Sequence, residues 1–78
     1  MRLLVVEDQK DLCDIIVRKL KSEGYGVDAC NSGEDAEDYI NGTEYDAVLL
    51  DIMLPGKTGI GLLKDMRARG NLTPVILL

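Results

Sequence analysis

The sequence of 78 residues contains no histidine, tryptophan or phenylalanine, and it contains only two cysteines. Zinc sites use clustered Cys and His ligands, so the lack of histidine and the wide separation of Cys13 and Cys30 exclude one. We expect both cysteines to be small reduced side chains near the core, which is compatible with a cytoplasmic location.

Long hydrophobic runs and clusters of basic residues are also absent. No apolar stretch approaches the roughly 20 residues of a membrane helix and no signal peptide is visible, so we expect no membrane contact. Nine basic and fourteen acidic residues give a net charge of −5. This balance argues against nucleic-acid contact by this segment, which would need clustered Lys and Arg, and it suits metal cations or basic partner surfaces instead.

Four apolar runs of strand length are present. We predict strands over 2–6, 46–50 and 75–78, because their apolar runs at 3–6, 47–50 and 75–78 are continuous, as is typical of strands that are covered on both faces, and Pro74 fits at the start of the last one. Residues 27–30 are shorter and alternate in polarity, which favours an edge strand.

Three segments between these runs have helical spacing of apolar residues. We predict helices over 9–23, 33–41 and 59–69, with Ser32 and Thr58 as N-caps and Gly24 and Gly70 as C-terminal stops. The expected inward residues are Leu12, Ile15, Ile16 and Leu20, then Ala36 and Ile40, then Leu62, Leu63 and Met66. The alternation of strands and helices predicts an α/β domain with right-handed crossovers and a parallel sheet.

Acidic residues close two of the buried strands. Glu7 and Asp8 follow the first strand, and Asp51 follows the third. Parallel neighbours lie about 4.8 Å apart, so adjacent first and third strands would bring these acids together at one edge of the sheet. An all-oxygen ligand set suits Mg²⁺, and Asp51 would also be placed to accept a phosphoryl group. In a purely structural alternative, Asp8 caps the first helix and Glu7 interacts with its dipole.

Two motifs carry a resemblance to a known family. Val5-Val6-Glu7-Asp8 and Leu49-Leu50-Asp51-Ile52-Met53-Leu54-Pro55-Gly56, with Gly59 beyond them, resemble the receiver domains of two-component response regulators. The resemblance covers the whole chain and implies a flavodoxin-like, doubly wound parallel sheet, here incomplete, with strand order 2-1-3-4. It implies that Asp51 is the phosphoacceptor and that Mg²⁺ is held by Glu7, Asp8, Asp51 and the backbone carbonyl of Met53.

The same resemblance implies a partner and a cytoplasmic location. A sensor histidine kinase would supply the phosphoryl group from a phosphohistidine, and the chain itself would be no enzyme beyond self-catalysed transfer. The expected docking face is the first helix, with Leu12 and Ile16 partly exposed. DNA binding, as in some regulators of this family, would belong to an output domain outside this segment.

The resemblance also suggests that residues 1–78 are the N-terminal portion of a receiver domain. The family's switch Ser/Thr would follow the fourth strand and its phosphate-pairing Lys would end a fifth strand, and both positions fall after Leu78. We therefore expect impaired phosphorylation, and self-association as a homodimer or larger species through the exposed strand 74–78. Lys57 and Lys64 are expected to be solvated surface charges.

Two other functions are compatible with the sequence. The chain could be a non-catalytic, self-associating interaction module whose acids are merely solvated. A haloacid-dehalogenase-type phosphatase also places a nucleophilic Asp after an apolar strand, but it needs a second Asp where this chain has Met53. Binding of Mg²⁺ at Glu7, Asp8 and Asp51 would separate the receiver from the interaction module.

Overall fold

Strands and helices alternate along the whole chain, as the apolar pattern predicts. The computed structural model describes all 78 residues. Its elements, in chain order, are β1 (Arg2–Val6), α1 (Lys10–Ser22), β2 (Gly26–Cys30), α2 (Gly33–Gly42), β3 (Ala47–Leu50), α3 (Gly59–Ala68) and β4 (Val75–Leu77). Every predicted element is present, with ends that differ from the prediction by at most one residue.

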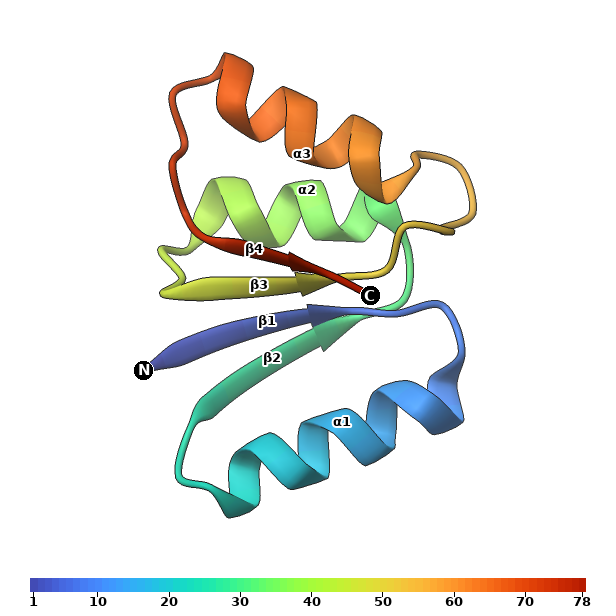
Figure 1. Cartoon of the computed structure of the whole chain (residues 1–78), viewed down its shortest axis with the longest axis vertical. Helices are drawn as coiled ribbons and strands as arrows, with labels where there is room; N and C mark the ends of the chain where they lie inside the picture. The colour runs from blue at the N-terminus through green and yellow to red at the C-terminus, as the bar shows by residue number, and fades with distance from the viewer.

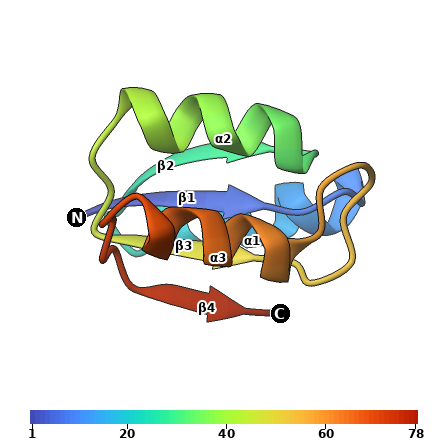
Figure 2. The ribbon, with the colours of Figure 1, turned by 90° about the horizontal axis from the view of Figure 1, so that it is seen from above.

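The four strands form one parallel sheet in the order β2-β1-β3-β4. Helices α2 and α3 lie on one face of the sheet and α1 lies on the other (Figure 1). Seen from above, the strands fan out from β2 to β4, and the loop between β3 and α3 extends beyond the carboxyl ends of the strands (Figure 2). The predicted flavodoxin-like order, with β1 beside β3, is confirmed.

The core lies between the sheet and helices α2 and α3. Leu4 and Val6 of β1 and Val48 and Leu50 of β3 are fully buried in it. Their neighbours in this core come from the end of β2, the helices and the loops, and they are Cys30, Ala36, Ile40, Tyr45, Leu54, Leu62 and Met66. Each of the larger apolar side chains contributes about 1.5–3 kcal/mol by its burial, so this layer holds the strand ends in place.

The predicted helix caps are present. The side-chain oxygen of Ser32 accepts from the amide of Asp35, and that of Thr58 accepts from the amide of Gly61. Gly24 has φ of +92°, a conformation that ends α1 at little cost only because glycine has no Cβ.

Helix α1 differs from its predicted orientation. Ile15, expected inside, is 63% exposed, and the buried residue of the helix is Cys13. Leu12 is 41% exposed, which agrees with its expected partial exposure. The reason for this orientation is that α1 packs mainly on β1 and β2, so a narrow stripe of the helix is covered, and the small side chain of Cys13 faces the strands. Both cysteines are buried and free, as predicted, and burial raises the pKa of the Cys30 thiol to about 12.

Strand β4 is present but it lies at an edge. It pairs with β3 on one side only, and Ile76 is 55% exposed although its sequence is typical of a central strand. None of the three helices is long and apolar enough to cross a membrane.

The amino-terminal edge of the sheet carries a second group of polar residues. Asp28 of β2 accepts a hydrogen bond from the Tyr45 hydroxyl at 2.6 Å and pairs with the Arg2 guanidinium at 2.8 Å. The backbone amide of Arg2 donates to Asp46 at 2.7 Å. Oδ2 of Asp28 accepts hydrogen bonds from both the phenol and the guanidinium. These contacts join the starts of β1 and β3 to β2.

Candidate metal centre

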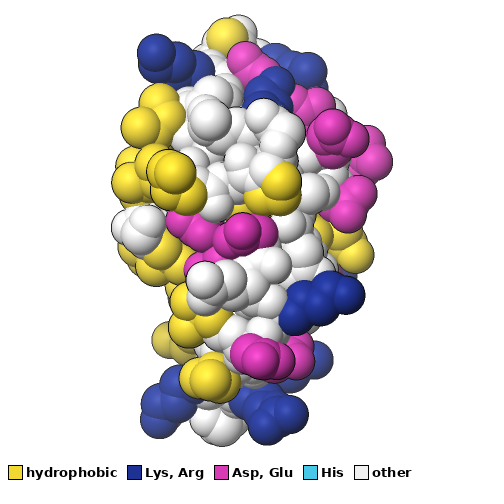
Figure 3. Space-filling view, turned by 90° about the vertical axis from the view of Figure 1, so that its right-hand side faces the viewer, with side chains coloured by type: hydrophobic (Ala, Val, Ile, Leu, Met, Phe, Trp, Pro, Cys, Tyr) yellow, Lys and Arg dark blue, Asp and Glu magenta, His cyan; other side chains and the backbone are white.

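The predicted acids meet at the carboxyl-terminal edge of the sheet. Val6 pairs with Leu50 across β1 and β3, and the Asp51 amide donates to the Val6 carbonyl at 3.0 Å. This register places Glu7 and Asp8 beside Asp51, with one carboxylate oxygen of each within 4.8 Å of the others. Figure 3 looks onto this edge and shows acidic side chains gathered in its middle, with hydrophobic side chains to one side.

Glu7 is the most buried of the three acids. It is 4% exposed, and its Oε2 accepts a hydrogen bond from the Gln9 amide at 3.2 Å. Burial raises the pKa of the Glu7 carboxyl, and the carboxylates of Asp51 and Asp8 raise it further, whereas the Gln9 amide lowers it. A carboxylate that is buried beside two other carboxylates favours binding of either a proton or a cation.

Asp8 does not cap helix α1. The N-cap is Gln9, which makes no side-chain cap hydrogen bond, and Asp8 is exposed beside the other two acids. The structural alternative in which Asp8 serves as the cap is therefore wrong. Its carboxylate is left available at the edge of the sheet.

Asp51 is held by the loop that follows it. Its Oδ1 accepts from the Met53 amide at 3.0 Å, and the Gly59 amide donates to the Ile52 carbonyl at 3.0 Å. A Cβ on Gly59 would collide with the Asp51 carbonyl, so glycine permits the start of α3 to close against the end of β3. Met53 is 77% exposed, and its backbone amide is the part that contacts Asp51.

The donor set fits a hard cation. The three ligands are carboxylates, no nitrogen or sulfur donor belongs to the cluster, and every ion pair of the chain lies elsewhere. Mg²⁺ prefers such oxygen ligands and retains several waters, which suits a cluster open on its solvent side. The oxygen donors present are therefore compatible with Mg²⁺.

Two neighbours of the site were not predicted. Nδ2 of Asn31, at the end of β2, donates to the Glu7 carbonyl at 2.8 Å. Lys57, expected to be a solvated charge, is 30% exposed at its side chain and pairs with Glu37 of α2 and Asp65 of α3. No short sequence pattern indicates either contact, because each joins residues from different elements. Lys64, by contrast, is exposed as predicted.

The sequence is similar to those of known proteins. Residues 3–78 match the family model of the response regulator receiver domain. The transcriptional regulatory protein DltR of Streptococcus agalactiae is 49% identical over all 78 residues, which are 35% of that protein. The chain thus spans about a third of the length of the curated relatives that it matches.

Solved structures agree with the fold. The receiver domain of the Francisella response regulator 1452 superposes with a TM-score of 0.95 at 34% identity, over 97% of this chain and 63% of that one. The response regulator TrrA of Thermotoga maritima, solved in complex with Mg²⁺ and BeF, gives a TM-score of 0.92 at 33% identity, over 97% of this chain and 66% of that one. Neither the family match nor these structures supports the haloacid-dehalogenase alternative. The chain, with its two acidic strand ends on a 2-1-3-4 parallel sheet, belongs to the family of response regulator receiver domains.

Proposed function

We propose that this chain binds Mg²⁺ and accepts a phosphoryl group on Asp51 in two-component signal transduction. The observation that carries the proposal is the approach of Glu7, Asp8 and Asp51 to within 4.8 Å with no basic side chain paired to them. Glu7, Asp8, Asp51 and the Met53 carbonyl would hold the ion. The proposal treats residues 1–78 as the N-terminal portion of a receiver domain.

In the proposed reaction, a carboxylate oxygen of Asp51 attacks the phosphorus of a phosphohistidine on a sensor histidine kinase. The new P–O bond forms as the P–N bond breaks, and the histidine leaves with its electron pair. The Met53 amide holds Oδ1 of Asp51, so the other oxygen is the one available for attack. Bound Mg²⁺ would neutralise charge on the phosphoryl oxygens. Hydrolysis of the acyl phosphate would then restore the Asp51 carboxylate.

The similarity to TrrA supports the metal part of the proposal, because that protein was solved with Mg²⁺ and BeF. The test is an NMR titration of the chain with Mg²⁺, followed by a small-molecule phosphodonor and mass spectrometry. We expect shifts centred on residues 7, 8 and 51–53 and addition of one phosphoryl group, which Asp51→Asn abolishes. Absence of the Mg²⁺ shifts would contradict the proposal and favour the interaction module.

We further propose that phosphoryl transfer to the 78-residue chain is slow. No lysine pairs with the acids, and neither Thr58, the cap of α3, nor Thr73, before β4, belongs to the cluster. A cation and a hydroxyl aimed at the phosphoryl oxygens would contribute to stabilising the transition state. Labelling at the rate of a complete receiver domain would show that this part is wrong.

The relatives indicate where the signal would lead. DltR is described as a transcriptional regulatory protein, so we propose that this receiver serves a regulator of transcription in the cytoplasm. The segment itself would make no DNA contact, since its net charge of −5 opposes binding to phosphates. Helix α1, with Leu12 and Ile15 exposed, is the proposed face for the kinase.

As a second property, we propose that the 78-residue chain self-associates through strand β4. Its outer edge has no partner strand, and Ile76, Leu77 and Leu78 are 55%, 39% and 48% exposed. An apolar edge of this kind is a template for pairing with a second copy. Sedimentation at micromolar concentration is the test, and a purely monomeric species would contradict the proposal.

A further inference from the structure

The loop that follows Asp51 is fastened to two helices by one side chain. Nζ of Lys57 donates to the carboxylates of Glu37 in α2 and Asp65 in α3. The two acids would repel one another without the cation between them. The hydrogen bonds to Asp65 and Glu37 raise the pKa of Lys57, and Lys57 lowers the pKa of Asp65, so Lys57 and Asp65 are both charged at neutral pH. The side chain of Lys57 is a charged tie between the loop and both helices.

The backbone of the same loop packs against the first turn of α2. A Cβ on Gly33 would lie 2.5 Å from the Lys57 carbonyl oxygen, closer than real contacts allow. Gly56 has φ of +75°, and a Cβ there would lie 3.3 Å from Oε1 of Glu34. The far limb of the loop therefore follows the surface of α2 at both residues 56 and 57.

The start of α2 is connected to the acids from its other side. Asn31, two residues before α2, donates to the Glu7 carbonyl, and Ser32 caps the helix. A closed ring of contacts thus runs from Glu7 through residues 31–33 to Lys57 and back along the loop to Asp51. The ion pairs of Lys57 are the only charged link in this ring.

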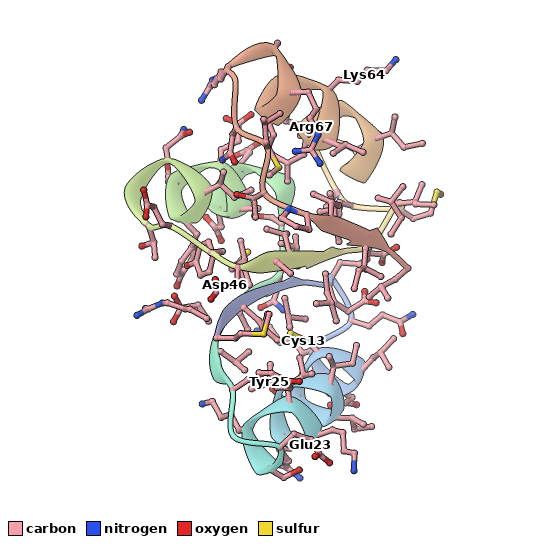
Figure 4. All side chains as sticks on the ribbon, turned by 60° about the vertical axis from the view of Figure 1, so that its left-hand side comes forward. Cys13, Glu23, Tyr25, Asp46, Lys64 and Arg67 are labelled. Carbon is pink, nitrogen blue, oxygen red and sulfur yellow. The ribbon has the colours of Figure 1, made fainter.

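We propose that Lys57 is a positioning residue for the candidate metal centre. Its ion pairs fix the path of the loop and thereby the positions of Asp51 and the Met53 carbonyl. This inference rests on the proposed function where it concerns Mg²⁺, but not where it concerns the loop itself. Lys64 provides the matched control. It lies on α3, it points away from the molecule (Figure 4), and it takes part in none of the ion pairs.

Amide hydrogen exchange in metal-free buffer tests the loop alone. In Lys57→Met we expect exchange at residues 53–59 to accelerate about tenfold, while amides of β1 and β3 keep their rates and serve as the folding reference. Lys64→Met should leave the loop unchanged, and Lys57→Arg should restore much of its protection. Unchanged exchange in Lys57→Met would overturn the proposal whether or not the wild-type chain binds Mg²⁺.

Mg²⁺ titration of the same variants tests the consequence for the site. We expect Lys57→Met to bind Mg²⁺ about tenfold more weakly, the lower end of what loss of an outer partner of a ligand costs. Lys57→Met should add no further loss to Glu37→Gln/Asp65→Asn, because the tie is already absent there. Equal affinity in wild type and Lys57→Met would overturn the positioning role. If the wild type did not bind Mg²⁺, the proposed function would be refuted. The hydrogen-exchange data would still show whether Lys57 holds the loop.

Discussion

The two edges of the sheet each gather acidic residues, but they treat them in opposite ways. At the amino-terminal edge, Asp28 receives a phenol and a guanidinium. At the carboxyl-terminal edge, Glu7 receives one backbone amide and otherwise faces two more carboxylates. The hydrogen bond from Tyr45, and then that from Arg2, lowers the pKa of Asp28, whereas burial raises the pKa of Glu7.

The difference teaches how to tell structural acids from acids that serve a ligand. A carboxylate that the fold itself satisfies adds to stability, because its partners are ordered together with it. Carboxylates brought together without a cation repel one another and cost stability, and a bound cation would offset that cost. On this criterion Asp28 is structural, and the acids at residues 7, 8 and 51 are the candidates for the proposed Mg²⁺ site.

The largest expected effect is on Mg²⁺ affinity. Asp51→Asn or Glu7→Gln should weaken Mg²⁺ binding by at least about tenfold, because each removes one charged oxygen ligand. Asp28→Asn, the matched change at the opposite edge, should leave it unaltered. Calorimetric or NMR titration at neutral pH measures all three variants. Equal losses at both edges would mean that the effect is general electrostatics and not a site.

The next effect is the pH dependence of that binding. Since the pKa of Glu7 is raised and the ion binds the carboxylate form, affinity should rise with pH through this pKa and then level off. Below it, each pH unit should cost up to about tenfold in affinity, and one proton should be released per ion bound. Glu7→Gln should abolish this step. A step of the same size in Glu7→Gln would assign the proton to another group.

Part of the contrast between the two edges of the sheet can be predicted from the sequence, and part of it cannot. Continuous apolar runs that end in acid predict β1, β3 and the meeting of Glu7 with Asp51, because parallel strands place their ends together. The same reasoning does not find Tyr45 beside Asp28, since that pair joins β2 to the loop before β3 through a side chain whose direction depends on packing.

Helices α1 and α2 show the same division. Ser32 and Gly24 mark helix ends through local backbone chemistry, and both predictions are confirmed. The rotation of α1 about its axis, with Cys13 inside and Ile15 outside, depends on which strands lie beneath it. The ion pairs of Lys57 likewise depend on the distance between α2 and α3. Helix ends that depend on local chemistry can be predicted from the sequence, whereas contacts between elements can be known only once the sheet is assembled.

Stability should respond with opposite signs at the two edges. In metal-free buffer at pH 7, Asp28→Asn should lower the free energy of unfolding by about 1–2 kcal/mol, because it removes a charged hydrogen-bond acceptor. Glu7→Gln should raise it by about 0.5–1 kcal/mol, because the buried charge is removed while the Gln oxygen can still accept from Gln9.

Urea denaturation as a function of pH checks both signs. The lowered pKa of Asp28 contributes stability that is present above the ordinary Asp value near 3.9 and is lost as pH falls through the lowered one. The cost of Asp28→Asn should therefore disappear in strong acid. The raised pKa of Glu7 acts in reverse, so the gain in Glu7→Gln should vanish as pH falls below the ordinary Glu range, about 4.3. If both substitutions changed the free energy of unfolding in the same direction, the proposed difference between the two edges would be wrong.

The smallest effect is the titration of one phenol at the amino-terminal edge. Burial, and then the hydrogen bond to Asp28, raises the pKa of Tyr45 to about 12. The stability that this bond contributes is complete below the ordinary tyrosine value of about 10 and is lost as pH rises through the raised one. Ultraviolet absorption of the phenolate should show one late-titrating tyrosine of the three, which Tyr45→Phe removes and Asp28→Asn shifts back toward about 10. If no tyrosine titrates late, neither the burial of Tyr45 nor its hydrogen bond to Asp28 is strong enough to make that edge the counterpart of the proposed Mg²⁺ site.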